Sequence, residues 1–451
     1  MDFVSLLPQL GGFFYIVASF VLALSVIVAV HEYGHYIVGR WCGIHAEVFS
    51  LGFGPVLASR VDKRGTRWQI ALLPFGGFVK FLGDADAASG KDADAMQAAA
   101  ADPAALRRTM HGAPLWARAA TVAAGPVFNF IMSAVIFTLV FWSQGTPRDP
   151  ITIDRLVNLP ELSEPVGLQA GDELLDVAGL PVPSLSDGPA WETFRRTVPS
   201  EQSLSYRVLR DGAEIEVTGP YPWPPYVHAV APRSAASDIG LRPGDVIAGV
   251  DGNAIFTFDQ LKEAVESANG AELDLTVWRD GTEFSAALSP RRVDEPQPDG
   301  GFATRWRMGI VGGLAFEQAS ETVPFTEALS GGALQVWAVV DMSLSGLSHM
   351  ITGAISTCNL SGPIGIAETS GAMASQGAES FIRFIAVLST AVGLLNLFPI
   401  PALDGGHLMF YAYEAVTGKP PSDRVMRLLM SFGIAAILTL MVFALGNDLF
   451  C

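Results

Sequence analysis

The stretch VIVAVHEYGHYIVGR, from Val26 to Arg40, places three ionisable side chains at the end of an apolar run. The run extends from Gly11 to Val30, and about 20 apolar residues suffice for a helix to cross a bilayer. A secretory signal peptide would carry a basic amino-terminal region and a small-residue cleavage site, and neither pattern is found here. We therefore expect a transmembrane helix that ends with His31, Glu32 and His35, and ionisable groups in such helices are usually functional.

The composition agrees with a membrane protein that has attached soluble parts. Half of the 451 residues are hydrophobic, and 16% are charged, against about 25% in soluble domains. The formal charge of -17 argues against nucleic acid as a partner, because nucleic acid binds basic surfaces. The three cysteines are scattered and suggest neither a disulfide framework nor a cysteine-based zinc site.

Three further apolar runs are long enough to cross a membrane, and basic residues orient all four. The runs are Leu115 to Trp142, Phe381 to Phe398 and Leu428 to Leu445. Lysine and arginine concentrate between the first two runs and again between the last two, which predicts that both of these loops are cytoplasmic. The amino terminus and the long segment 143–380 would then face outward.

The stretch from Phe325 to Ser356 is a fifth apolar candidate, but charges interrupt it. It contains Glu327, Asp341 and His349, and charged residues within a membrane span are costly. We expect an amphipathic helix that lies on the outer membrane surface or across the other helices.

The outward-facing segment contains a repeat. VGLQAGDELLDVAGLPV (Val166 to Val182) corresponds to IGLRPGDVIAGVDGNAI (Ile239 to Ile255), and an Asp-Gly hairpin signal follows each copy. The recurring Gly-Leu-x-x-Gly-Asp pattern resembles PDZ domains of the kind attached to bacterial proteases. PDZ domains bind extended peptides at a sheet edge. The alternative is a pair of small β-barrels without a ligand groove.

His31 and His35 are four residues apart, so on a helix both imidazoles project from one face. This spacing suits one zinc ion, with Glu32 as general base. Catalytic zinc usually has a third protein ligand, and NLFPIPALDGGHLMF (Asn396 to Phe410) offers Asp404, with His407 as the alternative. Asp404 shares a membrane side with the histidines only if the stretch from Phe325 onward does not cross.

These motifs together resemble the site-2 protease family, and most closely its bacterial regulator-of-sigma-E protease type with two PDZ domains. The resemblance rests on His-Glu-x-x-His in the first membrane helix, Asn-x-x-Pro-x-Pro-x-Leu-Asp-Gly in a later one, and the intervening modules. It implies an intramembrane zinc metalloprotease of the bacterial inner membrane that acts in regulated intramembrane proteolysis. Its substrates would be transmembrane proteins, such as anti-sigma factors, or signal-peptide remnants. The PDZ domains would be periplasmic and the active site near the cytoplasmic side.

Three other segments match the family. SLGFGP (Ser50 to Pro55) resembles its re-entrant β-hairpin. This implies that an extended substrate segment pairs, as an added strand, with Leu51, Gly52 and Phe53. An ordinary cytoplasmic hairpin is the alternative.

Two asparagines would hydrogen-bond the substrate backbone, and Asn396 would also help to stabilise the oxyanion, although either could instead help helices to pack. They are Asn129 in AAGPVFNFIMS and Asn396. The match at LSGPIGIAE (Leu360 to Glu368) suggests no separate role.

The expected fold is an α-helical polytopic membrane protein with four transmembrane helices, a re-entrant β-hairpin and two tandem PDZ domains. The expected parts are as follows: 1–40, first transmembrane helix with the zinc motif; 41–114, cytoplasmic β region and flexible loop; 115–142, second transmembrane helix; 149–222 and 223–293, PDZ domains; 320–378, outer-surface helix and connector; 379–407, third transmembrane helix with the aspartate ligand; 424–447, fourth transmembrane helix.

A different class of function is a catalytically inert membrane scaffold that binds partners through its PDZ domains. Inert relatives usually lose the zinc motif, whereas His31, Glu32, His35 and Asp404 are all present. A zinc transporter would need several polar residues along its spans, and these are nearly absent. The sequence names neither the substrate, the activating signal, a peptide ligand of the modules nor the oligomeric state.

Overall fold

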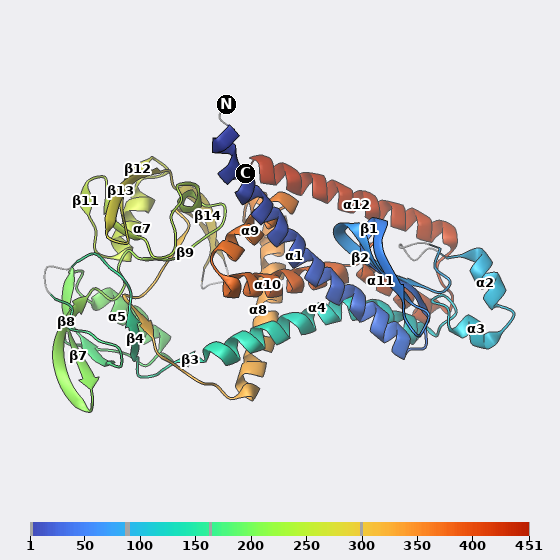
Figure 1. Cartoon of the computed structure of the whole chain (residues 1–451), viewed down its shortest axis with the longest axis horizontal. Helices are drawn as coiled ribbons and strands as arrows, with labels where there is room; N and C mark the ends of the chain where they lie inside the picture. The colour runs from blue at the N-terminus through green and yellow to red at the C-terminus, as the bar shows by residue number, and fades with distance from the viewer. Residues whose placement is uncertain (1–2, 86–90, 162–164, 298–300, 451) are drawn as a thin grey trace. The chain divides into compact units, whose positions relative to one another are not determined.

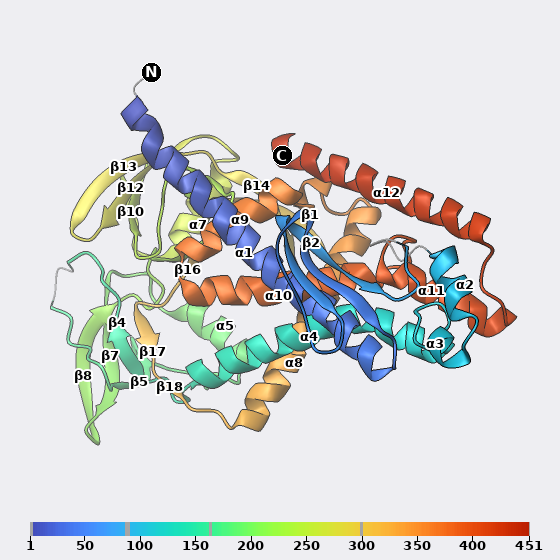
Figure 2. The same cartoon turned by 45° about the vertical axis from the view of Figure 1, so that its right-hand side comes forward.

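The computed structural model describes residues 3–85, 91–161, 165–297 and 301–450. The chain forms two compact units (Figures 1 and 2). The first comprises Met1–Val140, Thr326–Thr352 and Thr357–Cys451, and the second comprises Phe141–Phe325 with Gly353–Ser356. Each unit is described by itself.

Four helices in the described part of the chain are long and apolar enough to cross a membrane, as expected. They are α1 (Phe3–Trp41), α4 (Leu115–Gln144), α10 (Ala378–Leu397) and α12 (Asp423–Phe450). The third is shorter than the expected 379–407. It ends at Leu397, and Asp404 begins a separate helix, α11 (Asp404–Thr417), after a turn with hydrogen bonds to the carbonyl of Ile400.

Contacts between side chains and backbone fix the relative directions of three of these helices. His31 contacts Asn129 while His35 contacts the earlier Thr121, so α1 and α4 are antiparallel. Ser389 donates to the carbonyl of Asn129, and Ser133 donates to the carbonyl of Ala386, so α4 and α10 are also antiparallel. Helices α1 and α10 therefore run in the same direction.

Helix α8 (Phe325–Ile351) is not among the candidate spans found in the described residues. It crosses α4 rather than running alongside it (Figures 1 and 2). The two helices meet closely where Gly332 lies against the backbone and hydroxyl of Thr138. This crossing agrees with the expectation of a helix that lies across its neighbours.

The segment LSGPIGIAE has a structural role that the sequence did not reveal. It leads into α9 (Pro363–Ser375), and the carboxylate of Asp448 in α12 accepts hydrogen bonds from the backbone amides of Gly362, Ile364 and Gly365. The carboxylate thus satisfies amides that helix geometry leaves unpaired at an amino terminus. Just before it, the short 3-10 helix η1 (Thr357–Asn359) contains Cys358, which is disulfide-bonded, contrary to our expectation from the cysteine pattern.

Strands β1 (Ala46–Val61) and β2 (Arg67–Phe81) form a hairpin around a turn at residues 62–66. Its register corrects one prediction. Leu51 pairs with both Gly77 and Ile70, so neither backbone side of Leu51 is free to accept a substrate strand. The next part of the chain is also more ordered than the expected flexible loop, because Asp92 caps α2 (Ala93–Ala99) and α3 (Pro103–Arg107) follows. Residues 86–90 of that loop lie outside the described residues.

The repeats of the second unit fold into matching four-stranded sheets. The first has the order β6-β5-β7-β8 and the second β11-β10-β12-β13. Their elements are β5 (Glu173–Val177), β6 (Leu180–Pro181), α5 (Gly188–Thr197), β7 (Ser203–Arg210) and β8 (Ala213–Pro220), and then β10 (Val246–Val250), β11 (Asn253–Ala254), α7 (Phe258–Ser267), β12 (Leu273–Arg279) and β13 (Thr282–Leu288). Each module has its own buried apolar core.

The segment after the second module returns to both modules. Strand β16 (Ile310–Gly312) pairs with β9 (Val227–Val230), and β17 (Phe316–Gln318) pairs with β4 (Ile153–Leu156). The remaining elements are β3 (Thr146–Pro147) with β18 (Ser320–Glu321), the hairpin β14 (Arg291–Pro296) with β15 (Phe302–Arg307), and α6 (Ala235–Asp238). The compact unit therefore extends beyond the expected boundary at residue 293.

The recurring aspartate of the repeat motif is buried and paired with an arginine in both modules. Arg210 donates two hydrogen bonds of 2.7 Å to Asp172, and Arg279 donates two of 2.6 and 2.8 Å to Asp245. Burial of Asp172 opposes its ionisation, but the hydrogen bonds from Arg210 and from the amide of Gln169 outweigh burial and lower its pKa below the usual range. In the first module the Asp–Arg pair therefore fixes the loop before β5 to the end of β7. In the second module it fixes the loop before β10 to the end of β12.

Candidate metal centre

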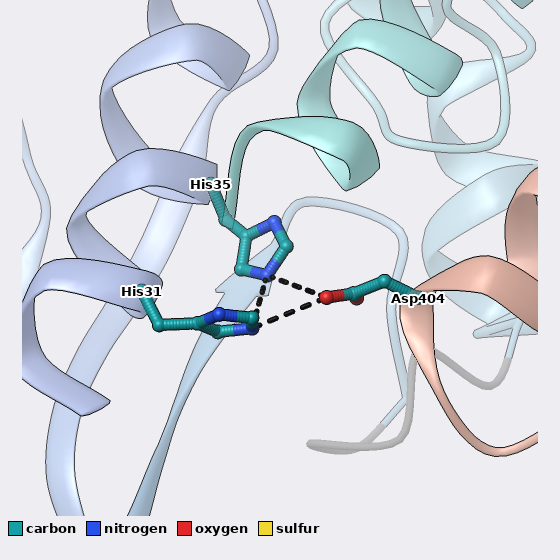
Figure 3. A group of neighbouring side chains, drawn as sticks. All are labelled: His31, His35 and Asp404. Carbon is teal, nitrogen blue, oxygen red and sulfur yellow. Dashed lines mark hydrogen bonds and ion pairs between the residues drawn. The ribbon is translucent and has the colours of Figure 1, made fainter. Parts of the chain in front are cut away.

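Three predicted ligands converge at one point of the first unit (Figure 3). His31 and His35 extend from consecutive turns of α1, and Asp404 approaches from the first turn of α11. The Nε2 atoms of the two histidines are 3.1 Å apart. Oδ2 of Asp404 lies 3.1 Å from Nε2 of His31 and 3.5 Å from Nε2 of His35.

These separations fit a tetrahedral zinc ion. Ligand atoms about 2.0–2.1 Å from such an ion lie roughly 3.3 Å from one another, close to the three observed distances. The chemistry of the atoms also fits, because a carboxylate oxygen is an acceptor and Oδ2 of Asp404 is buried without a hydrogen-bond donor. Three acceptor-capable atoms pointing at one another are repulsive unless a cation or protons lie between them.

The outer nitrogens of both histidines have partners that orient the rings. Nδ1 of His35 donates to the backbone carbonyl of Thr121 at 2.8 Å, which leaves the lone pair on Nε2 for a metal. Nδ1 of His31 lies 3.2 Å from the amide nitrogen of Asn129, whose Oδ1 is buried without a partner. If the oxygen and nitrogen atoms of the Asn129 amide exchange places, Oδ1 accepts a hydrogen bond from Nδ1 of His31.

Asn129 consequently has a different position from the one predicted for substrate binding. Its side chain is fully buried, and its described side-chain partner is His31. In this structure the amide of Asn129 lies against His31, and its predicted role in substrate binding stays a prediction.

The other predicted residues lie around the three ligands without joining them. Glu32 packs on β2, where Gly77 approaches its Cγ and the backbone of Val79 faces its carboxylate. Asn396 donates to the carbonyl of Val392 in its own helix. His407 is not in the ligand group found among the described residues.

Gly52 has a backbone φ of +90° and lies against strand β2, and Phe53 stacks on Phe78.

Sequence reasoning missed the residue that lets the two histidines approach α4. A Cβ atom on Gly125 would lie 2.3 Å from Nε2 of His35 and 2.8 Å from Cε1 of His31. Such distances are not tolerated, so only glycine fits there. The glycine directly before Pro126 in a membrane helix is a signal that could have raised the question.

Sequence reasoning also missed a link between α4 and α11, the helix that carries Asp404. Arg118 donates two hydrogen bonds to Glu414, of 3.1 and 2.6 Å, and its guanidinium also lies over the ring of Tyr411. Both members of the pair are largely buried, with 13% and 17% of their side chains exposed. The link holds the aspartate-bearing helix to the helix that supports His35.

Comparison with known proteins identifies the family of the chain. The model of peptidase family M50 matches residues 19–440. "Putative zinc metalloprotease Atu1380" of Agrobacterium fabrum is 35% identical over 96% of this chain and 95% of its own length. "Regulator of sigma-E protease RseP" of Escherichia coli is 33% identical over 97% of this chain and 99% of its own, and "Protease RseP" of Yersinia pestis is 31% identical over 96% and 97%. The chain belongs to peptidase family M50.

Proposed function

We propose that this metalloprotease cleaves transmembrane segments of membrane proteins, with His31, His35 and Asp404 as the ligands of a catalytic zinc ion. The observation that carries the proposal is the convergence of these three side chains beside helices long enough to cross a membrane: the histidines lie in the last part of α1, and Asp404 follows the end of α10 after a short turn. Ligands placed there would act on a peptide bond at or within the bilayer. The likeness to sigma-E-regulating proteases supports anti-sigma factors or signal-peptide remnants as the substrate class.

The residues around the ligands have distinct chemical roles in this proposal. Bound zinc would lower the pKa of a water molecule and polarise the scissile carbonyl. Glu32 would take the proton from the attacking water and return it to the departing amine. Thr121 and Asn129 would keep the two imidazoles oriented, and Asn396 would donate to the oxyanion if it exchanged its present bond within α10.

A substrate helix must unwind before its peptide bonds can be cleaved, and its freed backbone groups then need partners. Because both sides of Leu51 are occupied, we place the added strand at the outer side of residues 77–81, which lie beside Glu32. The hairpin also exposes large apolar side chains, which supports its insertion into the bilayer. They are Phe53, Val56, Leu57, Ile70, Leu72 and Leu73.

The proposed orientation places the metal near the cytoplasm. Helices α1 and α10 run in the same direction, so the segment from Gly145 to Gly377 starts and ends on one membrane side. A single crossing by α8 is incompatible with that arrangement. The basic residues in segments 41–114 and 419–427 support the placement of these two segments, on the other side of the membrane, in the cytoplasm. The disulfide bond of Cys358 supports an oxidising, outer compartment for its own side.

The two repeat modules would be periplasmic PDZ domains that restrict which substrates reach the metal. Their matching strand order, each with one helix, supports this assignment. They would take no part in the chemistry, because the metal-ligand group found among the described residues lies in the other unit.

The proposal is tested with the full chain in lipid nanodiscs and a single-span substrate of the same membrane orientation. We expect cleavage within the span, its loss on zinc removal by a chelator, and its recovery on adding zinc. His407→Asn serves as a control and should retain zinc. A zinc-loaded protein that binds the substrate but never cuts any span would instead identify an inert scaffold.

A further inference from the structure

A cavity of about 230 Å³ lies where α1 meets the β1–β2 hairpin, away from the three metal ligands. Its walls come from the end of α1, the start of β1, the turn at residues 62–66 and the segment after α3. Its charged or ionisable lining residues are Arg40, His45, Arg64 and Arg108. We propose that this cavity binds a phosphate group, a function that goes beyond the proposed proteolysis and does not depend on it.

The cavity carries an excess of positive charge that the protein itself does not neutralise. Asp62 lies in the turn at residues 62–66, and its carboxylate is 3.8 Å from Arg40, while Glu47 beside the cavity pairs with Lys80 at 3.3 Å. Arg64 and Arg108 have no carboxylate partner in the part of the chain that the structure describes. Cationic residues that line one cavity repel one another, so an anion bound there would stabilise the site.

Asp62 is already occupied and cannot balance the other two arginines. Its Oδ1 accepts from the backbone amides of Arg64 and Thr66 at 2.8 and 3.0 Å. Its Oδ2 accepts from the indole of Trp68 and the hydroxyl of Tyr36 at 3.2 and 3.4 Å. These bonds hold the turn in place and leave Arg64 and Arg108 without a carboxylate partner among the described residues.

The donors that remain select phosphate rather than a neutral ligand. The hydroxyl of Thr66 donates to the carbonyl of Ala46, and the amides of Ile44 and His45 donate to backbone carbonyls, so these groups are used. Recognition therefore falls to the guanidiniums, which match the oxygens of phosphate in pairs.

Two exposed tryptophans place the cavity at the level of lipid headgroups. Trp41 follows Arg40 at the end of α1, and Trp116 lies in the first turn of the antiparallel helix α4. Their side chains are 72% and 63% exposed. Exposed tryptophans at the ends of membrane helices lie at the membrane–water boundary. The phosphate could come from an anionic phospholipid or from a soluble phosphate, and the experiment must distinguish them.

The test compares the full chain with Arg64→Gln/Arg108→Gln in two binding measurements. In the first, native mass spectrometry counts phosphatidylglycerol retained from nanodiscs. In the second, calorimetry measures inorganic phosphate binding in a neutral detergent. The double variant should bind about tenfold more weakly per guanidinium removed. Arg60→Gln/Arg67→Gln, an exposed pair on the same hairpin that does not line the cavity, is the matched control.

Binding lost by the double variant and kept by the control pair supports the proposal. A loss in the lipid measurement alone identifies a headgroup, and a loss with inorganic phosphate alone identifies a soluble ligand. Absence of binding in both measurements, or an equal loss in the control pair, overturns it. If the glutamine variant does not fold, Arg64→Lys/Arg108→Lys decides, because losing paired hydrogen bonds should still weaken binding measurably. Unchanged binding by the lysine variant would also overturn the proposal.

Discussion

Replacing Gly125 with alanine should displace the metal ligands while leaving the helix intact. The added Cβ would lie 2.3 Å from Nε2 of His35, whereas ordinary contacts begin at 3.4 Å. The imidazole or helix α4 must therefore move by about 1 Å, and metal–ligand distances tolerate only about 0.2 Å. Because His35 is also held by Thr121, the ring cannot turn away without losing that hydrogen bond.

We expect zinc affinity to fall by at least 10–100-fold, the range seen when groups that orient metal ligands are lost. Alanine favours a helix over glycine by about 1 kcal/mol, so the substitution should not unfold α4 for reasons of helix propensity. The assay is competition for zinc between the purified protein and a chelator of known affinity, with the unfolding temperature measured in parallel.

Gly446→Ala is the matched control, because Gly446 lies in transmembrane helix α12 with open space where its Cβ would be. It should leave zinc affinity unchanged. Wild-type zinc affinity in Gly125→Ala would refute the close approach of α4 to the ligands.

Three other predictions concern the link between α4 and α11, the stability of the second unit and the membrane orientation. Arg118→Leu should lower stability by about 3 kcal/mol, read from the unfolding temperature, because it leaves Glu414 buried without its partner. Asp172→Asn should destabilise the second unit most at neutral pH, since a lowered pKa gives stability above the usual aspartate range that is lost as pH falls through the folded pKa. Cysteines at Thr322 and Gly377 should both react with an impermeant reagent from the outside.

Each of these predictions has a result that would contradict it. Arg196→Ala, at an exposed ion pair, should change stability by less than about 0.5 kcal/mol. If Arg118→Leu changes stability by no more than this control, the Arg118–Glu414 pair does not stabilise the link between α4 and α11. If the stability difference between Asp172→Asn and the wild type grows on acidification, folding does not lower the pKa of Asp172. Labelling at Thr322 but not at Gly377 would mean that α8 crosses the membrane, which would separate Asp404 from the histidines.

Local patterns predicted the candidate spans and the convergence of His31, His35 and Asp404, for physical reasons. A membrane span depends on apolar length, which composition shows directly, and all four expected spans are helices of sufficient length. His31 and His35 must share a helix face because their spacing matches one turn. Predicting Asp404 as the third ligand required its sequence motif as well as the expected membrane topology. In the structure, Oδ2 of Asp404 lies within 3.5 Å of Nε2 of both histidines.

Features that depend on distant parts of the chain were not predictable. The double pairing of Leu51 depends on how β2 folds back beside β1, and no local pattern specifies it. The position of Asn129 beside His31 likewise depends on how α1 and α4 pack, which the sequence around Asn129 does not show. The turn that separates α10 from α11 was missed although it has a local signal, because Pro399 and Pro401 cannot continue a helix past Leu397.

The central claim is that Glu32 is the general base at a zinc ion that it does not ligate. The most direct measurement is the rate at which Glu32→Gln, with its zinc content determined in the same sample, cleaves a transmembrane substrate. We predict full zinc occupancy and a rate reduced by about 10²–10⁴-fold, the usual contribution of a general base. A zinc-loaded Glu32→Gln protein that cleaves at the wild-type rate would contradict the account.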